Sequence, residues 1–332
     1  MGDTPQEASV PDVLLRVAGL SVDLPGQDGP VRIIDDVSFD VRAGTTVGLI
    51  GETGSGKTMT AMSIIGLLPE DATVTGSIEF EGIDLVTAGQ ARLRSLRGHE
   101  ISMIFQDPMA SLNPTQRVGR QVGEVLRRSG VPRAEARSRA VEMLERVGIP
   151  EPARRARAYP HELSGGLRQR AMIAMAMIAH PSLVLADEPT TALDVTVQAR
   201  VLDLLRRLQT EENAAMLLVS HDLRVMSHVA HDLVVMYAGR VAERGAASAV
   251  LRRPAHPYTR ALVRSVPAVR TKTAIADPLP GTSVTPARRP SGCPFHPRCP
   301  IAVDRCRTEI PPLREVAPDR WSACHEAERV LT

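Results

Sequence analysis

Two hydrophobic patterns divide the chain. On either side of a turn at 25–29, residues 13–17 and 31–41 alternate apolar and polar side chains, which is typical of a half-exposed antiparallel sheet. The second pattern consists of short apolar runs, the most continuous of which suit strands that are covered on both faces. These runs occupy residues 47–50, 76–80, 101–105, 183–186 and 215–219. Together the patterns predict an antiparallel sheet beside a largely parallel α/β core.

Apolar residues at helical spacing dominate the middle of the chain. They share one helical face in two stretches, namely Val118, Val122, Val125 and Leu126, and then Ala140, Val141, Leu144 and Val147. We therefore expect a helical insertion at 107–162, between two parts of the α/β core. Residues 171–179 are apolar on every side, so the helix that contains them should be buried.

A glycine-rich turn follows the apolar run at 47–50 and leads into a stretch with helical spacing. It fits the pattern G-x-x-x-x-G-K-[ST], whose glycines let backbone N–H groups curve around a phosphate chain. Lys57 would reach the β- and γ-phosphates of a nucleotide, and the Thr58 hydroxyl would hold Mg²⁺. The start of the helix would add its partial positive charge. The predicted nucleotide-binding loop comprises Gly51, Glu52, Thr53, Gly54, Ser55, Gly56, Lys57 and Thr58.

Polar residues also end the other predicted parallel strands. Because ligands bind at the carboxyl ends of strands in an open α/β sheet, Gln106, Asp187, Glu188 and His221 should converge on the phosphates. Asp187 is suited to hold Mg²⁺, and Glu188 to take a proton from an attacking water. His221 can donate to the γ-phosphate. We predict Glu188, His221 and Gln106 as catalytic residues, and Thr58, Gln106 and Asp187 as the magnesium site.

Composition narrows the class of partner. With 40 basic and 38 acidic residues the net charge is +2, which gives no reason to expect nucleic acid. Only four Phe, three Tyr and one Trp are present, too few for platforms that stack bases. The N-terminus lacks a basic signal-peptide region, and the longest apolar run is about half of what spans a bilayer. We expect a chain that is made and kept in the cytoplasm.

Six motifs in a characteristic order resemble those of the ATP-binding-cassette (ABC) ATPases. They are the loop 51–58, Gln106, the signature Leu163-Ser164-Gly165-Gly166, the pair Asp187-Glu188, the segment Ala192-Leu193-Asp194, and His221. The chain looks closer still to the ATPase subunits of dipeptide, oligopeptide and nickel importers. The similar stretches are PMASLNP, LSGGLRQRAMIAMAM, DEPTTALDVTVQ, MYAGRVAERG, HPYTRAL and CPFHPRCPIAVDRC. The resemblance covers essentially the whole chain.

The resemblance implies a fold and a domain organisation. The fold class is α/β: an ABC-type nucleotide-binding domain, whose P-loop core carries the antiparallel β subdomain and the helical insertion, plus a small Cys-containing C-terminal extension. We place the ATPase domain at 10–250, with the helical insertion and the approach to the signature at 107–162. The extension at 251–332 would contain a surface linker at 267–292, rich in Pro, Thr, Ser and Gly.

The resemblance also implies an activity and partners. Two cassettes, identical or different, would pair head to tail, and each ATP would lie between one phosphate loop and Ser164, Gly165 and Gly166 of the other subunit, with Asp194 nearby. ATP hydrolysis would drive two transmembrane permeases fed by an extracytoplasmic solute-binding protein. The insertion would carry the groove for a permease helix, which places the chain at the cytoplasmic face of the cell membrane. Di- or oligopeptides are the expected cargo. Nickel or another small solute is the alternative, and a soluble ABC ATPase not tied to transport is a remoter one.

One position departs from the family pattern. An aromatic side chain that stacks on adenine usually precedes the phosphate loop, and the matching position here is Leu24. We therefore expect contact with the base to be weaker than usual, or to come from another residue.

Four cysteines, Cys293, Cys299, Cys306 and Cys324, occupy the last 40 residues. A reducing compartment favours a metal site over disulfides. Four thiolates are a complete ligand set for a [4Fe–4S] cluster, and some members of the importer subfamily carry one. Zn²⁺ remains an alternative, because His296 and His325 lie beside the cysteines, although the gaps between the cysteines are wider than zinc ribbons favour. We rank the cluster first, zinc second and four unligated thiols third.

Overall fold

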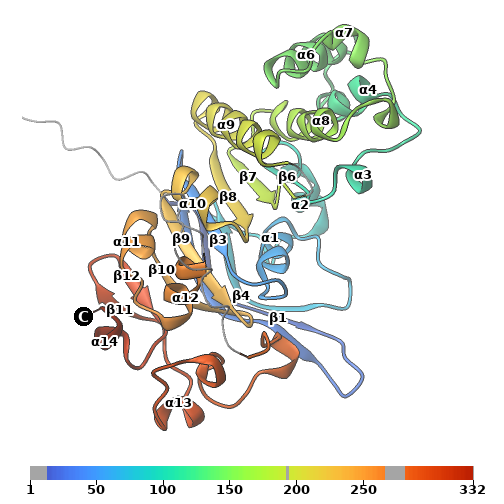
Figure 1. Ribbon diagram of the computed structural model, residues 1–332. Helices are drawn as coiled ribbons and strands as arrows, with labels where there is room; N and C mark the ends of the chain where they lie inside the picture. Colours follow the sequence, from blue (N-terminus) through green and yellow to red (C-terminus); the bar gives the residue numbers. More distant parts are fainter. Residues whose placement is uncertain (1–12, 192–193, 266–280, 332) are drawn as a thin grey trace, which may run out of the picture.

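The computed structural model describes residues 13–191, 194–265 and 281–331 (Figure 1). The first sheet within these ranges has four antiparallel strands in the order β2-β1-β4-β5. They are β1 (Val13–Leu24), β2 (Val31–Arg42), β4 (Thr73–Phe80) and β5 (Ile83–Asp84). The antiparallel sheet expected from the alternation at 13–41 is confirmed.

The second sheet has eight strands in the order β11-β12-β10-β9-β3-β8-β7-β6 in the described ranges. From β9 to β6 the strands are parallel. These strands are β3 (Thr46–Ile50), β6 (Ile101–Ile104), β7 (Leu183–Asp187), β8 (Ala215–Ser220) and β9 (Asp232–Tyr237). Every residue of β3, β6, β7 and β8 is buried, as their continuous apolar character predicts.

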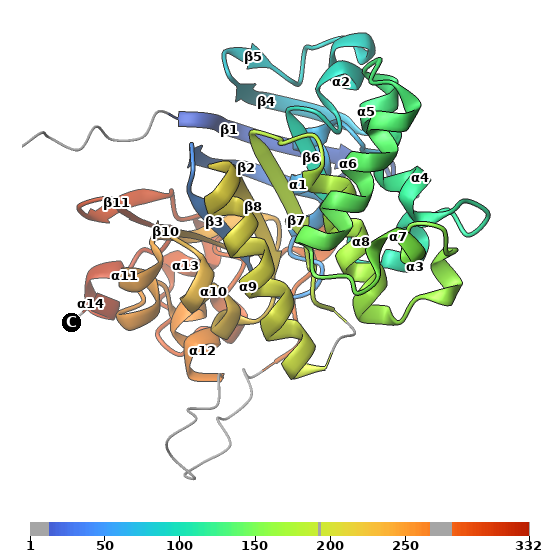
Figure 2. The same cartoon turned by 90° about the horizontal axis from the view of Figure 1, so that it is seen from above.

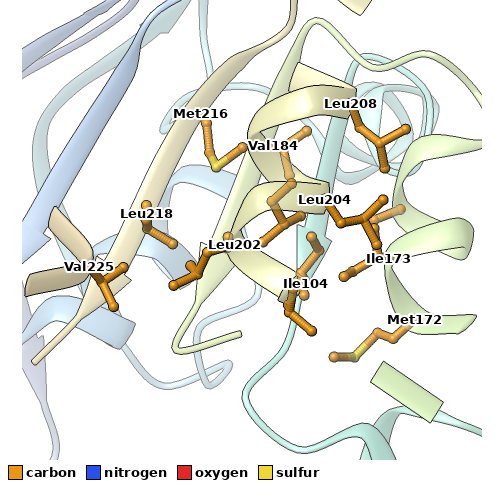
Figure 3. Packing of buried hydrophobic residues seen from close by; sticks show 14 of the residues in the cluster. Ile104, Met172, Ile173, Val184, Leu202, Leu204, Leu208, Met216, Leu218 and Val225 are labelled. Carbon is orange, nitrogen blue, oxygen red and sulfur yellow. The ribbon is translucent and has the colours of Figure 1, made fainter. Parts of the chain in front are cut away.

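Helices cover the parallel sheet. They include α1 (Lys57–Ile65), α2 (Gln90–Leu96), α8 (Gly165–Met177), α9 (Val195–Glu212) and α10 (Leu223–Val229). Alternate side chains of one strand enter different cores, because successive residues of a strand point to opposite faces. Leu183 and Leu185 of β7 join the core that contains α1 and the antiparallel sheet. Val184 joins the core beneath α8 and α9, where Ile173 and Leu204 lie close to it (Figure 3).

The segment at 107–162 is helical, as the sequence predicts, and it lies to one side of the sheets in both views (Figures 1 and 2). Its two amphipathic faces are buried or half-buried in the same core as α8. The helices are α3 (Pro108–Ser111), α4 (Val118–Val122), α5 (Glu124–Arg128), α6 (Arg133–Arg146), α7 (Pro152–Arg155) and the 3₁₀ turn η1 (Pro160–Glu162).

Residues after β9 continue the second sheet. The strands are β10 (Arg240–Ala246), β11 (Arg314–Ala317) and β12 (Arg320–Ser322), all antiparallel to their neighbours. Short helices surround them: α11 (Ala247–Arg252), α12 (Pro257–Ser265), η2 (Pro286–Arg288), η3 (His296–Arg298), α13 (Arg305–Thr308) and α14 (Ala327–Leu331). The C-terminal region thus shares a sheet with the nucleotide-binding core. Residues 267–280 of the expected linker lie outside the described residues.

The hydrophobic pattern did not predict the β9–β10 hairpin. A two-residue turn at Ala238-Gly239 joins its strands, and both residues have positive φ, 47° and 81°. Such backbone angles match the right-handed twist of a hairpin. The apolar run at 233–237 followed by a small residue and glycine was the signal that could have revealed it. In the described ranges, no helix is both long and apolar enough to cross a membrane.

A buried ion pair joins the C-terminal region to the core. Glu243 of β10 is 0% exposed and accepts hydrogen bonds from the backbone N–H groups of Ala255 and His256. Its carboxylate also contacts Arg320 of β12 at 2.9 Å. Burial raises the pKa of Glu243, and these donors oppose that shift. The charged form therefore depends on its partners remaining in place.

Replacing Arg320 with alanine should lower the free energy of unfolding by about 3–5 kcal/mol, because it leaves the Glu243 carboxylate buried without its countercharge. Urea unfolding of the full-length chain measures this loss. Arg314→Ala is the matched control, since Arg314 pairs with the exposed Glu328, and it should cost less than about 1 kcal/mol. Equal losses in the two variants would contradict a special role for the buried pair.

Candidate functional site

The phosphate loop lies between β3 and α1, as the sequence predicts. Gly51 and Gly56 have φ of 155° and 102°. A Cβ at Gly51 would lie 2.2 Å from the carbonyl oxygen of Met236, so the close approach of β9 excludes any side chain there. An added Cβ at Gly54 would meet nothing within 4 Å, so the space beside that residue is open. The loop is therefore tight against the protein on one side and open on the other.

Lys57 is buried at the start of α1, and its Nζ donates to the carbonyl oxygens of Gly51 and Glu52 at 2.8 and 2.9 Å. Burial lowers the pKa of Lys57, while the carboxylates of Glu188, Asp187 and Glu52 oppose that shift. Within the described chain, the buried hydroxyl of Ser55 has no hydrogen-bond partner. A buried ammonium and an unpartnered hydroxyl in one loop suit the oxygens of a phosphate group.

Thr58 and Asp187 meet at the carboxyl ends of β3 and β7. The Thr58 hydroxyl donates to Asp187 Oδ1 at 3.1 Å, and burial raises the pKa of Asp187. A hydroxyl and a carboxylate are oxygen donors of the kind that Mg²⁺ prefers. A bound cation would also offset the burial of the carboxylate. This donor set fits the magnesium site expected from the sequence.

Glu188 receives contacts from three directions. Its Oε1 lies 3.1 Å from Nδ1 of His221, and its Oε2 accepts from Gln106 Nε2 at 3.1 Å and from the Thr191 hydroxyl at 2.9 Å. The sequence motifs indicated His221 and Gln106 but not Thr191. A pocket of about 620 Å³ lies beside Glu188 and His221. Gln106 and His221 thus both contact Glu188, and open space lies beside Glu188 and His221.

The signature residues lie at the start of a helix. Ser164 is the N-cap of α8, and its side chain accepts a hydrogen bond from the Leu167 N–H at 3.4 Å. Ser164 and Gly165 are exposed, and Gly166 is half-buried. An added Cβ at Gly165 would meet nothing within 4 Å. This helix start therefore opens onto free space.

Asp194 is exposed and caps α9, accepting from the N–H groups of Thr196 and Val197 at 3.1 and 3.0 Å. The preceding motif residues, Ala192 and Leu193, lie outside the described residues. Leu24, the last residue of β1, is half-buried against the core of the antiparallel sheet.

A groove of about 1120 Å³ runs along the helical insertion. The sequence located a groove in this segment by resemblance but did not reveal its charge. Six arginines contribute to its lining, namely Arg117, Arg120, Arg127, Arg133, Arg137 and Arg157. The groove therefore favours an anionic occupant over a cationic one.

The four cysteines line one small cavity together with His256, His296 and His325. Burial raises the pKa of Cys293 to about 11 and that of Cys324 to about 12, which favours the neutral thiols. Among the described residues, no group of three or more His, Cys, Asp or Glu side chains has the geometry to hold a metal ion. The expected [4Fe–4S] cluster and the alternative Zn²⁺ are thus not supported by this geometry, although the thiols share a cavity.

Comparison with known protein families and relatives is consistent with a nucleotide-binding site. Residues 34–191 match the family described as ABC transporter, and residues 242–306 match the family described as oligopeptide/dipeptide transporter, C-terminal region. The chain is 45% identical over 326 residues to the oligopeptide transport ATP-binding protein OppD of Salmonella typhimurium, covering 98% of this chain and 97% of that protein. It is 46% identical over 314 residues to the dipeptide transport ATP-binding protein DppD of Escherichia coli, covering 94% and 96%.

A solved structure supports the fold. The ATP-binding cassette MJ0796, in a dimeric post-hydrolysis state bound to ADP and Pi, superposes with a TM-score of 0.63 at 26% identity. The match covers 70% of this chain and 98% of that one. With relatives about 45% identical over nearly its whole length, the chain belongs to the family of ABC transporter ATP-binding proteins.

Proposed function

We propose that the chain is the ATP-binding and ATP-hydrolysing subunit of a binding-protein-dependent ABC importer of di- or oligopeptides. The observation that carries the enzymatic part is the meeting of Gln106 and His221 on Glu188, one residue after the Asp187–Thr58 contact. The relatives named for oligopeptide and dipeptide transport support the cargo. Import of nickel or another small solute is the alternative, since cargo choice would lie in the permeases and the binding protein.

Each residue of the site has a separate role in ATP hydrolysis. Lys57 and the loop N–H groups bind the phosphates of ATP, with Ser55 adding its hydroxyl. Glu188 accepts a proton from the attacking water, which Gln106 orients, and His221 donates to the γ-phosphate. Thr58, Asp187 and Gln106 would hold Mg²⁺, which would supply positive charge to neutralise the phosphates.

The proposed partners follow from surfaces that one subunit leaves open. A second cassette, identical or different, would bring its Ser164, Gly165 and Gly166 to the phosphates, with Asp194 beside them. The arginine-lined groove of the helical insertion would receive a segment of one of two transmembrane permeases, and its charge favours acidic side chains in that segment. A solute-binding protein acts through the assembled complex. The chain would then lie peripherally at the cytoplasmic face of the cell membrane.

Lys57→Ala should weaken MgATP binding by about 30-fold or more, because it removes a buried charge that faces the phosphates. Isothermal titration calorimetry of the full-length chain measures the affinity. Lys272→Ala removes the only other lysine of the chain and should leave the affinity unchanged. Equal affinities in both variants would contradict the role given to Lys57.

Glu188→Gln should keep ATP binding, slow turnover by roughly 10²–10⁴, the usual worth of a positioned general base, and trap an ATP-bound dimer. ATP hydrolysis is measured in the complex with the permeases and the solute-binding protein, with peptide or Ni²⁺ as the added solute. Glu79→Gln, on the exposed side of β4, is the control. Turnover within a few-fold of the parent would remove Glu188 from the base role. Stimulation by Ni²⁺ and not by peptide would favour the alternative cargo.

We further propose that the cysteine cavity takes up a [4Fe–4S] cluster with a structural role, with zinc second and free thiols third. The support is that all four thiols line one cavity, and four thiolates are the ligand set of such a cluster.

Protein purified without oxygen should be brown and contain about four irons per chain. Cys299→Ser should lose the colour and most of the iron. A colourless preparation that holds one zinc and no iron would assign the site to zinc. A preparation that contains neither iron nor zinc would show that the four cysteines are free thiols.

A further inference from the structure

Three C-terminal residues hold the second residue of the phosphate loop. The backbone N–H of Glu52 donates to the hydroxyl of Tyr258 at 2.8 Å. The Glu52 carboxylate pairs with Arg298 at 2.9 Å and accepts a hydrogen bond from the Ser283 hydroxyl. Arg298 and Glu52 are 246 positions apart in the sequence. The contact therefore depends on the folded C-terminal region.

The side chains that hold Glu52 are rigidly placed. Arg298 is 5% exposed at its side chain, and it also donates to the hydroxyl of Tyr237 at 3.3 Å. The rings of Tyr237, Tyr258 and Phe295 pack together, with centroids 4.6 to 5.5 Å apart. The Arg298 guanidinium lies 5.9 Å from two of these rings. A charge held by this many contacts is preorganised to pair with Glu52.

Glu52 is also tied to the phosphate side of the loop, because its carbonyl oxygen accepts from Lys57 Nζ. Its carboxylate adds to the negative charge of Asp187 and Glu188 around Lys57. An unpaired carboxylate here would repel the phosphates of ATP, and pairing with a guanidinium weakens that repulsion. We propose that Arg298 and Tyr258 are positioning residues for nucleotide binding. They fix the backbone of the phosphate loop at Glu52 and neutralise its carboxylate.

The proposal rests on the ATP-binding role given above and adds a remote part of the chain to it. Arg298→Gln should weaken MgATP binding by roughly 5- to 30-fold, which lies in the lower part of the range usual for coupling between sites. In a Glu52→Gln background the same change should have little effect, because no carboxylate is left to neutralise. The same fold-loss in both backgrounds would show that Arg298 acts elsewhere and would overturn the proposal.

Matched variants separate positioning from folding. Arg298→Lys keeps the charge and should bind MgATP within about threefold of the parent, whereas Tyr258→Phe removes one acceptor and should bind more weakly. Arg305→Gln, which removes an exposed arginine of the same C-terminal region, should bind like the parent. If Arg298→Gln does not fold, the MgATP affinities of Arg298→Lys and Tyr258→Phe test the proposal instead. Parent-like affinity for MgATP in Tyr258→Phe would overturn the proposal. So would an Arg298→Lys variant that binds MgATP no better than a misfolded chain.

Steady-state kinetics of the assembled transporter give a second readout. Arg298→Gln should raise KM for ATP and leave kcat near the parent value, because Glu188, His221 and Gln106 are not touched. A fall in kcat with unchanged KM would overturn the positioning role. A parent chain that does not bind MgATP at all would instead overturn the proposed function.

Discussion

Burial of the parallel strands on both faces is the constraint on which the rest of the structure depends. Strands β3, β6, β7 and β8 carry hardly any polar side chain along their length, since a charge there would be removed from water on both sides. Apart from the neutral Ser102 within β6, the polar side chains of these strands lie at their ends. The sheet therefore collects its reactive side chains at one edge, and the order β9-β3-β8-β7-β6 decides which of them become neighbours.

That edge carries an excess of negative charge when it is empty. Lys57 lies among the carboxylates of Glu188, Asp187 and Glu52, and burial opposes its own charge. Neighbours offset each carboxylate in a different way: Thr58 donates to Asp187, Gln106 and Thr191 donate to Glu188, and Arg298 pairs with Glu52. A site of this kind suits a polyphosphate only together with a cation, because the carboxylates alone would repel it.

The sequence predicts local features better than distant contacts. Apolar runs and the loop motif were enough for β3, β7 and β8 and for the residues that follow them, because strand burial and ligand position are local consequences of the pattern. The contact between Arg298 and Glu52 joins residues that belong to no common motif, so no periodic pattern in the sequence predicts it. The short strands β11 and β12 gave no signal either, since each has only three or four residues of mixed character. The spacing of the four cysteines along the sequence likewise does not show that they line one cavity.

The long separation between Glu52 and its partners has a consequence for biosynthesis. The phosphate loop leaves the ribosome early, whereas Arg298 follows 246 residues later, and β12 later still. Domains generally begin to fold from the N-terminus during synthesis. In this chain the phosphate loop and the exposed edge of β10 acquire their final neighbours only after Arg298 and β12 have been synthesised. A ribosome that stalls before residue 298 would therefore release a chain whose nucleotide site is unfinished and whose sheet edge is open to other strands.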